Sequence, residues 1–294
     1  GQDPRDNNGH GVVATCNYVA RKYGVHSAMA SIQALRLVPK DKIVFVPPDF
    51  ETYRSVSAQI HSFMHEITDQ VESIALDEAS LDVTKNKIGE YSAVQIALNL
   101  QKRIRAELNL NSSFGVSYNK FLAKMGSEYA KPFGRVVILP DEAKRFLGMQ
   151  RIEKFPGIGP KTQEELHSMN VHTGADLQKI DPWILLKKFK KMGYILAQHA
   201  HGIDLRPIVA DSEINRKSIG IERTYEPAIY SRDEALTKMR RYCKHLEGEL
   251  KKRDFRANVV VLKLRDNNFN TITKRKKLPS SSDSYLEFYD IVQG

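Results

Sequence analysis

The apolar residues between positions 51 and 138 change their spacing several times, and this change most constrains the fold of the chain. Helical spacing over residues 51–72 predicts an amphipathic helix with one buried face, and a second helix is predicted over residues 91–108. Four short stretches have strand character instead, namely residues 73–76, 81–84, 114–117 and 135–138. Helices that alternate with strands predict a mixed core, which we assign to the α+β class.

The remainder of the chain has two further patterns. Strand signals disappear between residues 140 and 205, which predicts a small helical domain. After a polar stretch, the predicted elements are strand 218–225, helix 232–253, strands 257–264 and 270–275, and helix 284–292. This β-α-β-β-α order is one strand short of a split β-α-β repeat. We therefore predict domains over residues 1–139, 140–207 and 215–294, joined by a linker over residues 208–214.

The positive charge of the chain is concentrated near its end. The chain has 45 Lys and Arg against 35 Asp and Glu, a formal net charge of +10, and residues 215–294 hold 18 of the basic and 11 of the acidic side chains. A basic patch neutralises phosphates and gives affinity that depends on salt but not on base sequence. A solvated surface is the alternative. The run that we assign to DNA binding is Lys274, Arg275, Lys276 and Lys277.

Composition excludes several other classes of protein. No stretch reaches the roughly 18 apolar residues of a membrane span, and the first residues lack the apolar segment of a signal peptide. We therefore expect a cytoplasmic protein with no membrane partner. The two cysteines, Cys16 and Cys243, are too few for a disulfide framework or a thiolate zinc site, so both are predicted to pack as small apolar residues.

Three acids interrupt an apolar, strand-forming stretch at Asp77, Glu78 and Asp82. Burying unpaired carboxylates is costly, so such acids lie at an exposed strand end or share a cation. Adjacent carboxylates at a strand turn suit Mg²⁺, which keeps positions for water and substrate phosphates. An exposed acidic turn without a metal is the alternative reading of these residues.

Two segments carry residue types that bind phosphate groups. Tyr18 and Arg21 are one helical turn apart, so a phenol and a guanidinium could hold one phosphate chain, although a surface Arg beside a half-buried Tyr has the same pattern. Lys131 follows a predicted helix and either compensates the helix dipole or serves as a point charge for a triphosphate.

A glycine-rich stretch over residues 155–162 predicts a backbone phosphate site. Gly157 and Gly159 leave amides exposed, and Pro160 suits the first position of a helix whose N-terminus favours an anion. The pattern is typical of a helix-hairpin-helix, and a plain turn is the alternative.

Five motifs occur together in a characteristic order. They are VATCNYVARKYGV, LDEASLDVT, GVSYNKFLAKMGSEYAKPFG, FPGIGPKT and RKSIGIERTY. The set resembles the Y-family DNA polymerases, and within them the DinB (DNA polymerase IV) branch. The resemblance runs from about Gly9 to the last residue, which is nearly the whole chain.

The resemblance implies a right-hand polymerase. Residues 1–139 would form the palm and fingers, residues 140–207 a helical thumb with the helix-hairpin-helix, and residues 215–294 an α/β little finger. The family extends a primer past damaged template bases with low fidelity. The implied cofactor is Mg²⁺, two ions per active site in an intact protein. The implied partners are primer-template DNA and a dNTP, with a sliding clamp as a further candidate and a monomer as the expected state.

The resemblance also implies roles for single residues. Asp77 and Glu78 match catalytic, metal-binding acids. Thr15, Tyr18, Arg21 and Lys131 match residues that hold the incoming triphosphate, and Val12, Ala14 and Ala28 match small residues around the nascent base pair. A roomy pocket accepts distorted bases because it makes few contacts that reject them. Besides the basic run above, the positions that we expect to contact DNA are Ser117, Asn119, Lys120, Gly157, Gly159 and Lys161.

The sequence departs from the family pattern at both ends. Nothing before Gly9 resembles the first palm strand, which normally carries another metal-binding aspartate and an aromatic residue that excludes ribonucleotides. The last strand of the little finger is also missing. We therefore expect the fold to be incomplete at both ends and two-metal catalysis by this chain to be impaired.

Two other functions compete with polymerisation. A DNA-binding repair accessory, or an inactive fragment without catalysis, would also use the hairpin and the basic domain. A metal-dependent nucleotide cyclase would use the paired acids, but it leaves the hairpin and the basic domain unexplained.

Overall fold

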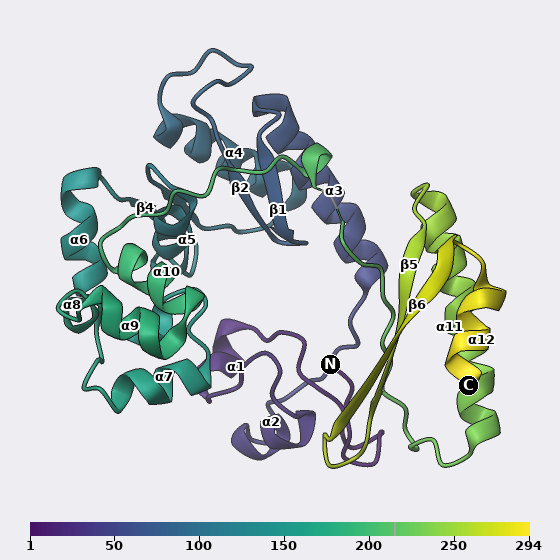
Figure 1. The fold of residues 1–294 in the computed structure, drawn as a ribbon. Helices are drawn as coiled ribbons and strands as arrows, with labels where there is room; N and C mark the ends of the chain where they lie inside the picture. Colours follow the sequence, from purple (N-terminus) through teal and green to yellow (C-terminus); the bar gives the residue numbers. More distant parts are fainter. Residues whose placement is uncertain (215) are drawn as a thin grey trace. The chain divides into compact units, whose positions relative to one another are not determined.

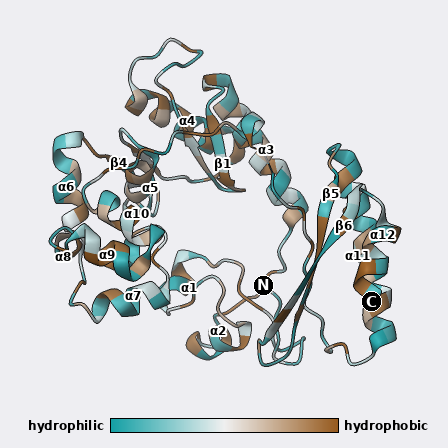
Figure 2. Cartoon of the chain, viewed as in Figure 1, coloured by the Kyte–Doolittle hydropathy of each residue, from teal (hydrophilic) through white to brown (hydrophobic). Residues whose placement is uncertain are grey.

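The computed structural model describes residues 1–214 and 216–294, and the chain separates into two compact units, Gly1–Ile214 and Asn215–Gly294 (Figure 1). Helices and strands both contribute, as the α+β prediction requires, and the described strands form three two-stranded sheets. Helices such as α3 (Phe50–Ile67) and α11 (Arg232–Lys252) carry hydrophobic and hydrophilic residues interleaved along their length (Figure 2). Among the described residues, no helix is both long and apolar enough to cross a membrane.

The first unit begins with a small subdomain around helices α1 (Tyr18–Lys22) and α2 (Ser31–Leu37). Its core consists of Val13, Val25, Ala34 and Val38. The segment before α1 also suggests a short strand, but the structure forms only an isolated bridge there, from Val12 to Ala30. Ala28 on the facing segment has a φ of 67°, which lies outside the extended region and prevents a longer ladder.

The central part of the first unit contains two long helices and two strand pairs. Helices α3 (Phe50–Ile67) and α4 (Ala93–Leu108) confirm the two predicted amphipathic helices, and both begin at a side-chain cap, Asp49 and Ser92 respectively. Strands β1 (Val71–Ala75) and β2 (Glu78–Leu81) form an antiparallel hairpin. The prediction of a strand over residues 81–84 was wrong, because the short turn after Ala75 starts the ladder already at Glu78.

A parallel pair completes this part of the fold. Strands β3 (Phe114–Val116) and β4 (Arg135–Val137) are joined by helix α5 (Lys120–Tyr129), which packs closely on β3. A Cβ atom at Gly115 would lie 2.1 Å from the carbonyl oxygen of Ala123, so only glycine allows this approach.

Residues 140–205 are helical, as predicted, with no strand beyond an isolated bridge in this described stretch. The helices are α6 (Pro140–Gly148), α7 (Pro160–His167), α8 (Gly174–Leu177), α9 (Pro182–Phe189) and α10 (Lys191–Ala200), with the 3-10 turn η1 (Ile152–Lys154) between α6 and α7. Their core includes Leu147, Phe155, Leu166 and Leu196, and helix α5 adds Phe121, Leu122 and Met125 to the same cluster.

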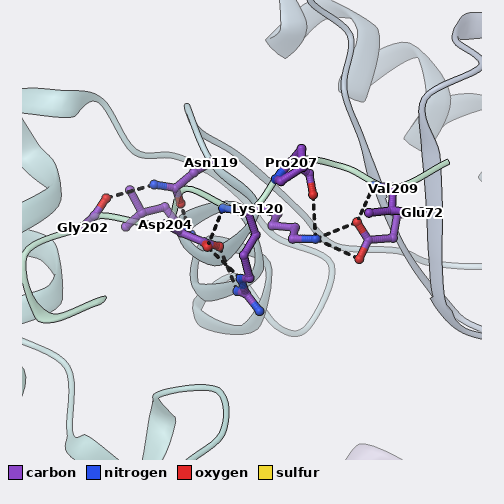
Figure 3. Close-up of polar contacts among 9 residues, drawn as sticks. Glu72, Asn119, Lys120, Gly202, Asp204, Pro207 and Val209 are labelled. Carbon is purple, nitrogen blue, oxygen red and sulfur yellow. Dashed lines mark hydrogen bonds and ion pairs between the residues drawn. The ribbon is translucent and has the colours of Figure 1, made fainter. Parts of the chain in front are cut away.

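The chain after α10 returns to strand β1 and helix α5 and is held there by side chains (Figure 3). The Lys120 ammonium lies 2.7 Å from a Glu72 carboxylate oxygen and 2.9 Å from the carbonyl oxygen of Pro207, and the same carboxylate accepts the Val209 amide at 3.0 Å. At the 3-10 turn η2 (Asp211–Glu213), the Asp211 carboxylate accepts the Ser73 amide at 2.8 Å. The predicted linker is therefore attached to β1 through residues 209 and 211.

The second unit consists of α11 (Arg232–Lys252), β5 (Ala257–Arg265), β6 (Thr271–Ser282) and α12 (Tyr285–Gln293). Cys243, Leu250, Leu278 and Phe288 form its core. The strand predicted over residues 218–225 is wrong, because the structure assigns no strand there. Side chains hold that segment instead: Ile219 packs on the core and Glu222 pairs with Lys263.

The cysteines pack as predicted. Cys243 is buried, which raises the pKa of its thiol to about 11, and Cys16 is half-buried with its Sγ atom 3.2 Å from the carbonyl oxygen of Val25.

A buried histidine predicts that stability depends on pH. The His199 ring is 5% exposed and stacks on Phe121 with centroids 3.9 Å apart. Burial lowers the pKa of His199 to about 4 from an ordinary 6.5, while Asp204 raises it and Arg206 lowers it to lesser extents. His199 therefore binds a proton more readily in the unfolded chain than in the folded one. Its contribution to the unfolding free energy is fully present above the unfolded pKa of 6.5 and is lost as the pH falls toward 4.

We expect a His199→Phe variant, which keeps a ring on Phe121, to lose less unfolding free energy than the unmodified chain on going from about pH 7 to about pH 5. The difference should reach about 2 kcal/mol in urea unfolding curves. Equal losses in the two proteins would show that His199 does not bind a proton on unfolding.

Candidate active site

The β1–β2 hairpin presents two carboxylates at its turn. Asp77 is exposed in the turn, and the described residues offer it no hydrogen bond or ion pair. Glu78 follows as the first residue of β2 and is half-buried. The turn is fixed from behind, because the Ser57 hydroxyl of α3 donates to the carbonyl oxygen of Leu76 at 2.6 Å.

The third acid of the motif does not share this position. The Asp82 amide donates to the Gln70 carbonyl, at the opposite end of the hairpin from the turn, and its carboxylate accepts the Thr84 amide at 2.8 Å. No cluster of three or more metal-ligating side chains occurs within the described parts of the chain. The turn therefore offers two carboxylates, those of Asp77 and Glu78, as metal ligands. Two oxygen ligands suit a divalent cation that keeps part of its water shell.

An ion-pair chain extends from Glu78 along helix α5. The Lys124 ammonium lies 2.5 Å from Glu78 and 2.7 Å from Glu128, and the Lys131 ammonium lies 2.7 Å from the same Glu128 oxygen. Desolvation opposes the charged form of Lys124 but its hydrogen bonds to Glu128 and Glu78 outweigh it, so the pKa of Lys124 is raised. Desolvation also opposes the charged form of Glu128, yet the two lysines hold the pKa of Glu128 below its ordinary value. Negative and positive charges thus alternate along this series of ion pairs, in the order Glu78, Lys124, Glu128 and Lys131.

The segment after α5 contacts the α1 residues that the sequence assigned to the triphosphate. Two residues after Lys131, the Phe133 ring meets the Tyr18 ring edge-on, with centroids 6.2 Å apart. The Arg21 guanidinium lies 5.9 Å from the centre of the Tyr18 ring. The structure therefore brings Tyr18 to the segment that carries Lys131, with Arg21 beside the Tyr18 ring. Thr15 lies exposed just before α1.

The three small residues assigned to the base-pair pocket lie on facing segments of the first subdomain. Val13 separates Val12 from Ala14, and its amide and carbonyl bond to residues 29 and 28. Val12, Ala14 and Ala28 are all exposed. All three side chains are small and apolar.

Three residues assigned to DNA have polar groups that are used inside the chain. The Ser117 hydroxyl donates to the Ile138 carbonyl at 2.8 Å, and Asn119 caps α5 while its amide donates to the Gly202 carbonyl at 2.9 Å. Lys120 is 13% exposed and pairs with Glu72. These side chains position α5 and the returning chain, and we assign them no free group for a phosphate.

The hairpin before α7 has the open backbone that the sequence indicated. Gly157 has a φ of 90°, which favours glycine. Gly159 is the N-cap of α7, and no side chain caps the helix there. The space where a Cβ atom of residue 159 would lie is open, with no described atom within 4 Å apart from its chain neighbours. Lys161 is exposed in the first turn of the helix. The free amides of α7 and this lysine are accessible together.

The basic run on β6 divides between the two faces of its sheet. In the antiparallel register Lys276 lies opposite Val260, which packs against the core, and Arg275 lies opposite Val261, which is exposed. Because successive strand residues alternate in direction, Lys274 and Lys276 share the face that carries α11 and α12, and Arg275 and Lys277 share the other face.

Three residues that the structure brings to this site, Lys124, Glu128 and Phe133, were not predicted from the sequence. Lys124 and Glu128 are four residues apart within α5, a spacing that places them on one helix face and could have indicated the pair. Nothing local pointed to Phe133, because its partner Tyr18 is more than a hundred residues earlier.

Comparisons with known proteins agree across the chain. The model of the impB/mucB/samB family matches residues 3–128, that of the family's C-terminal domain matches residues 216–294, and that of the DNA polymerase-iota thumb domain matches residues 153–204. DNA polymerase IV of Streptococcus gordonii is 47% identical over 95% of this chain and 77% of that protein. DNA polymerase IV of Streptococcus pneumoniae serotype 4 is 45% identical over 99% of this chain and 81% of that protein.

Solved structures share the fold. A Y-family DNA polymerase chimera of Dbh and Dpo4 superimposes with a TM-score of 0.79 at 23% identity, covering 98% of this chain and 81% of that chain. DinB from Sulfolobus solfataricus gives a TM-score of 0.64 at 22% identity, covering 97% of this chain and 81% of that chain. With family models matching most of its length and relatives 47% identical over nearly all of it, the chain belongs to the Y-family DNA polymerases, in the DinB or DNA polymerase IV branch.

Proposed function

We propose that this protein is a template-directed DNA polymerase that extends primers past damaged bases, and that the β1–β2 turn is its catalytic centre. The observation that carries the proposal is a series of ion pairs from Glu78, next to Asp77 in the turn, through Lys124 and Glu128 to Lys131. Two residues after Lys131, the Phe133 ring contacts Tyr18. This series connects the acidic turn to the segment that contacts α1, which supports a site with carboxylates for a metal and cationic groups for a triphosphate. A protein that only binds DNA has no need for such an arrangement, which favours polymerisation over an accessory role.

Asp77 and Glu78 are the residues that would hold divalent metal, and the family depends on such metals. Two Mg²⁺ ions are our proposal, and when bound they would favour attack by the primer 3′ hydroxyl and stabilise charge on the leaving group. The exposed Asp77 is available without breaking any contact, since the described residues give it no partner. Glu78 is available once its ion pair with Lys124 opens.

The phosphate-binding residues have complementary roles in this proposal. Arg21 offers a planar, permanently charged group that can hold phosphate oxygens bidentately, and Lys131 adds a mobile point charge. Tyr18 is fixed by its ring contact with Phe133, so its hydroxyl has a defined position. Thr15 completes the proposed triphosphate set. Val12, Ala14 and Ala28 leave room beside the base pair, which permits distorted template bases.

The thumb and the second unit would hold primer-template DNA through its backbone. The open amides at the start of α7 suit a phosphate. The face of β6 that carries Arg275 and Lys277 would supply affinity that does not depend on base sequence. Dependence on a sliding clamp, the monomeric state and a cytoplasmic location stay predictions from the sequence.

The first test separates catalysis from DNA binding. We expect Asp77→Asn, which removes one charge without changing size, to lower the Mg²⁺-dependent primer extension that this chain retains about 100-fold or more, because the metal supplies several kcal/mol of stabilisation. DNA affinity, measured by fluorescence anisotropy, should change little. Asp82→Asn is the matched control and should keep its activity, since Asp82 lies at the far end of the hairpin. Extension that survives Asp77→Asn would favour the accessory function.

The second test uses the two faces of β6. We expect the pair Arg275→Ala and Lys277→Ala to weaken DNA binding and to flatten the salt dependence by about 0.9 for each DNA phosphate that is no longer neutralised. The pair Lys274→Ala and Lys276→Ala removes equal charge from the face occupied by α11 and α12, and should change the salt slope less. Equal slopes for the two double variants would contradict a face-specific DNA contact.

The third test uses the open hairpin. Gly159→Asp places a carboxylate at the N-cap of α7, where it should stabilise the helix by about a few tenths of a kcal/mol but repel a DNA phosphate. Gly159→Asn offers a similar cap without charge. We expect both variants to melt at or above the temperature of the unmodified chain, and only the aspartate to lower DNA affinity. Equal DNA affinities would place the hairpin away from the duplex.

A further inference from the structure

The ion pair between Glu78 and Lys124 occupies the carboxylate that the proposed metal needs. Their charged atoms are 2.5 Å apart, and the two side chains are 32% and 28% exposed, so bulk water screens the pair only partly. An ammonium and a divalent cation repel each other when they share one carboxylate. Metal binding by Glu78 is therefore favoured when the Lys124 ammonium moves away.

The structure supplies a place for that ammonium. Glu128 lies one helical turn after Lys124, and its carboxylate oxygen is already 2.7 Å from the Lys124 nitrogen. An ammonium has three donors, so Lys124 can keep this bond while releasing Glu78. Without Glu128, the displaced charge would lie half-buried and unpaired, which is costly.

We propose that Lys124 is a resident counter-cation for Glu78, and that Glu128 takes up its ammonium when a divalent metal binds the acidic turn. Lys124 and Glu128 are then positioning residues, because neither touches the metal or the reacting groups. The inference rests on the proposed function, since it requires the acidic turn to be the metal site.

The structure predicts opposite effects for the two residues on metal affinity. Lys124→Met removes the competing cation and should tighten Mn²⁺ binding about twofold to fivefold, the range expected for a partly exposed ion pair. Glu128→Gln leaves the displaced lysine without its acceptor and should weaken Mn²⁺ binding by a similar factor. Lys124→Arg keeps the charge and should bind Mn²⁺ nearly as the unmodified chain does.

The decisive measurement is the double variant. Electron paramagnetic resonance of free Mn²⁺, without DNA or nucleotide, gives the metal affinity of the full chain directly. In the proposed exchange, Glu128→Gln has no effect once Lys124 is methionine, because no displaced ammonium remains to be received. If Glu128 instead acts only through its long-range field, losing its charge weakens Mn²⁺ binding equally whether residue 124 is lysine or methionine. That result would overturn the proposal.

Controls separate this inference from the function on which it rests. Lys87→Met removes a lysine from another ion pair, with Asp69, and should leave Mn²⁺ affinity unchanged. Asp77→Asn should remove the high-affinity Mn²⁺ site. If it does not, the acidic turn is not the metal site and the proposed function fails as well. If Asp77→Asn removes the site while Lys124→Met leaves the affinity unchanged, only the exchange proposal fails.

Circular dichroism of each variant establishes that it is folded before Mn²⁺ is added. If the methionine variant does not fold, the comparison of Lys124→Arg with Glu128→Gln still tests the exchange.

Discussion

Helix α5 packs on strand β3 more closely than any side chain at Gly115 would permit, and the rest of the first unit depends on this contact. The approach fixes the height of the helix above the strand pair. The opposite side of α5 then adds Phe121, Leu122 and Met125 to the core formed by helices α6 to α10. A single helix therefore packs against both the β3–β4 strand pair and the helices α6 to α10, and a shift of α5 would disturb both.

The polar residues of the same helix connect the fold to the proposed chemistry. Lys120, Lys124 and Glu128 are spaced four residues apart and so share one face of α5. Lys120 holds Glu72 and the returning chain at Pro207, whereas Lys124 and Glu128 hold Glu78 and Lys131. The face that stabilises the attachment of residues 207–211 thus continues into the face that organises the acidic turn. Charge neutrality along this row explains how several ionised groups can lie together half-buried.

Much of the architecture was predictable because it follows from local pattern. The helices at Phe50–Ile67, Ala93–Leu108 and Arg232–Lys252 have strong amphipathic periods and side-chain caps, so their positions required no tertiary information. The strands were less predictable. Whether the second strand of the hairpin starts at Glu78 or at Leu81 depends on turn length, and whether residues 218–225 form a strand depends on a pairing partner. Neither is encoded in a short window of residues.

The sequence alone determined the chemical inventory of this protein: an acidic pair at a strand turn, a Tyr and an Arg one turn apart, an open glycine hairpin, a basic final segment, and the order of motifs that identifies the family. Only the tertiary structure decided which of these groups are free to act. Lys120, Asn119 and Ser117 looked available for DNA until the fold gave each an internal partner, and the run at residues 274–277 looked like one patch until the strand register divided it. The physical reason is that an ionised or hydrogen-bonding side chain takes the nearest suitable partner, and in this chain many of those partners are far away in sequence.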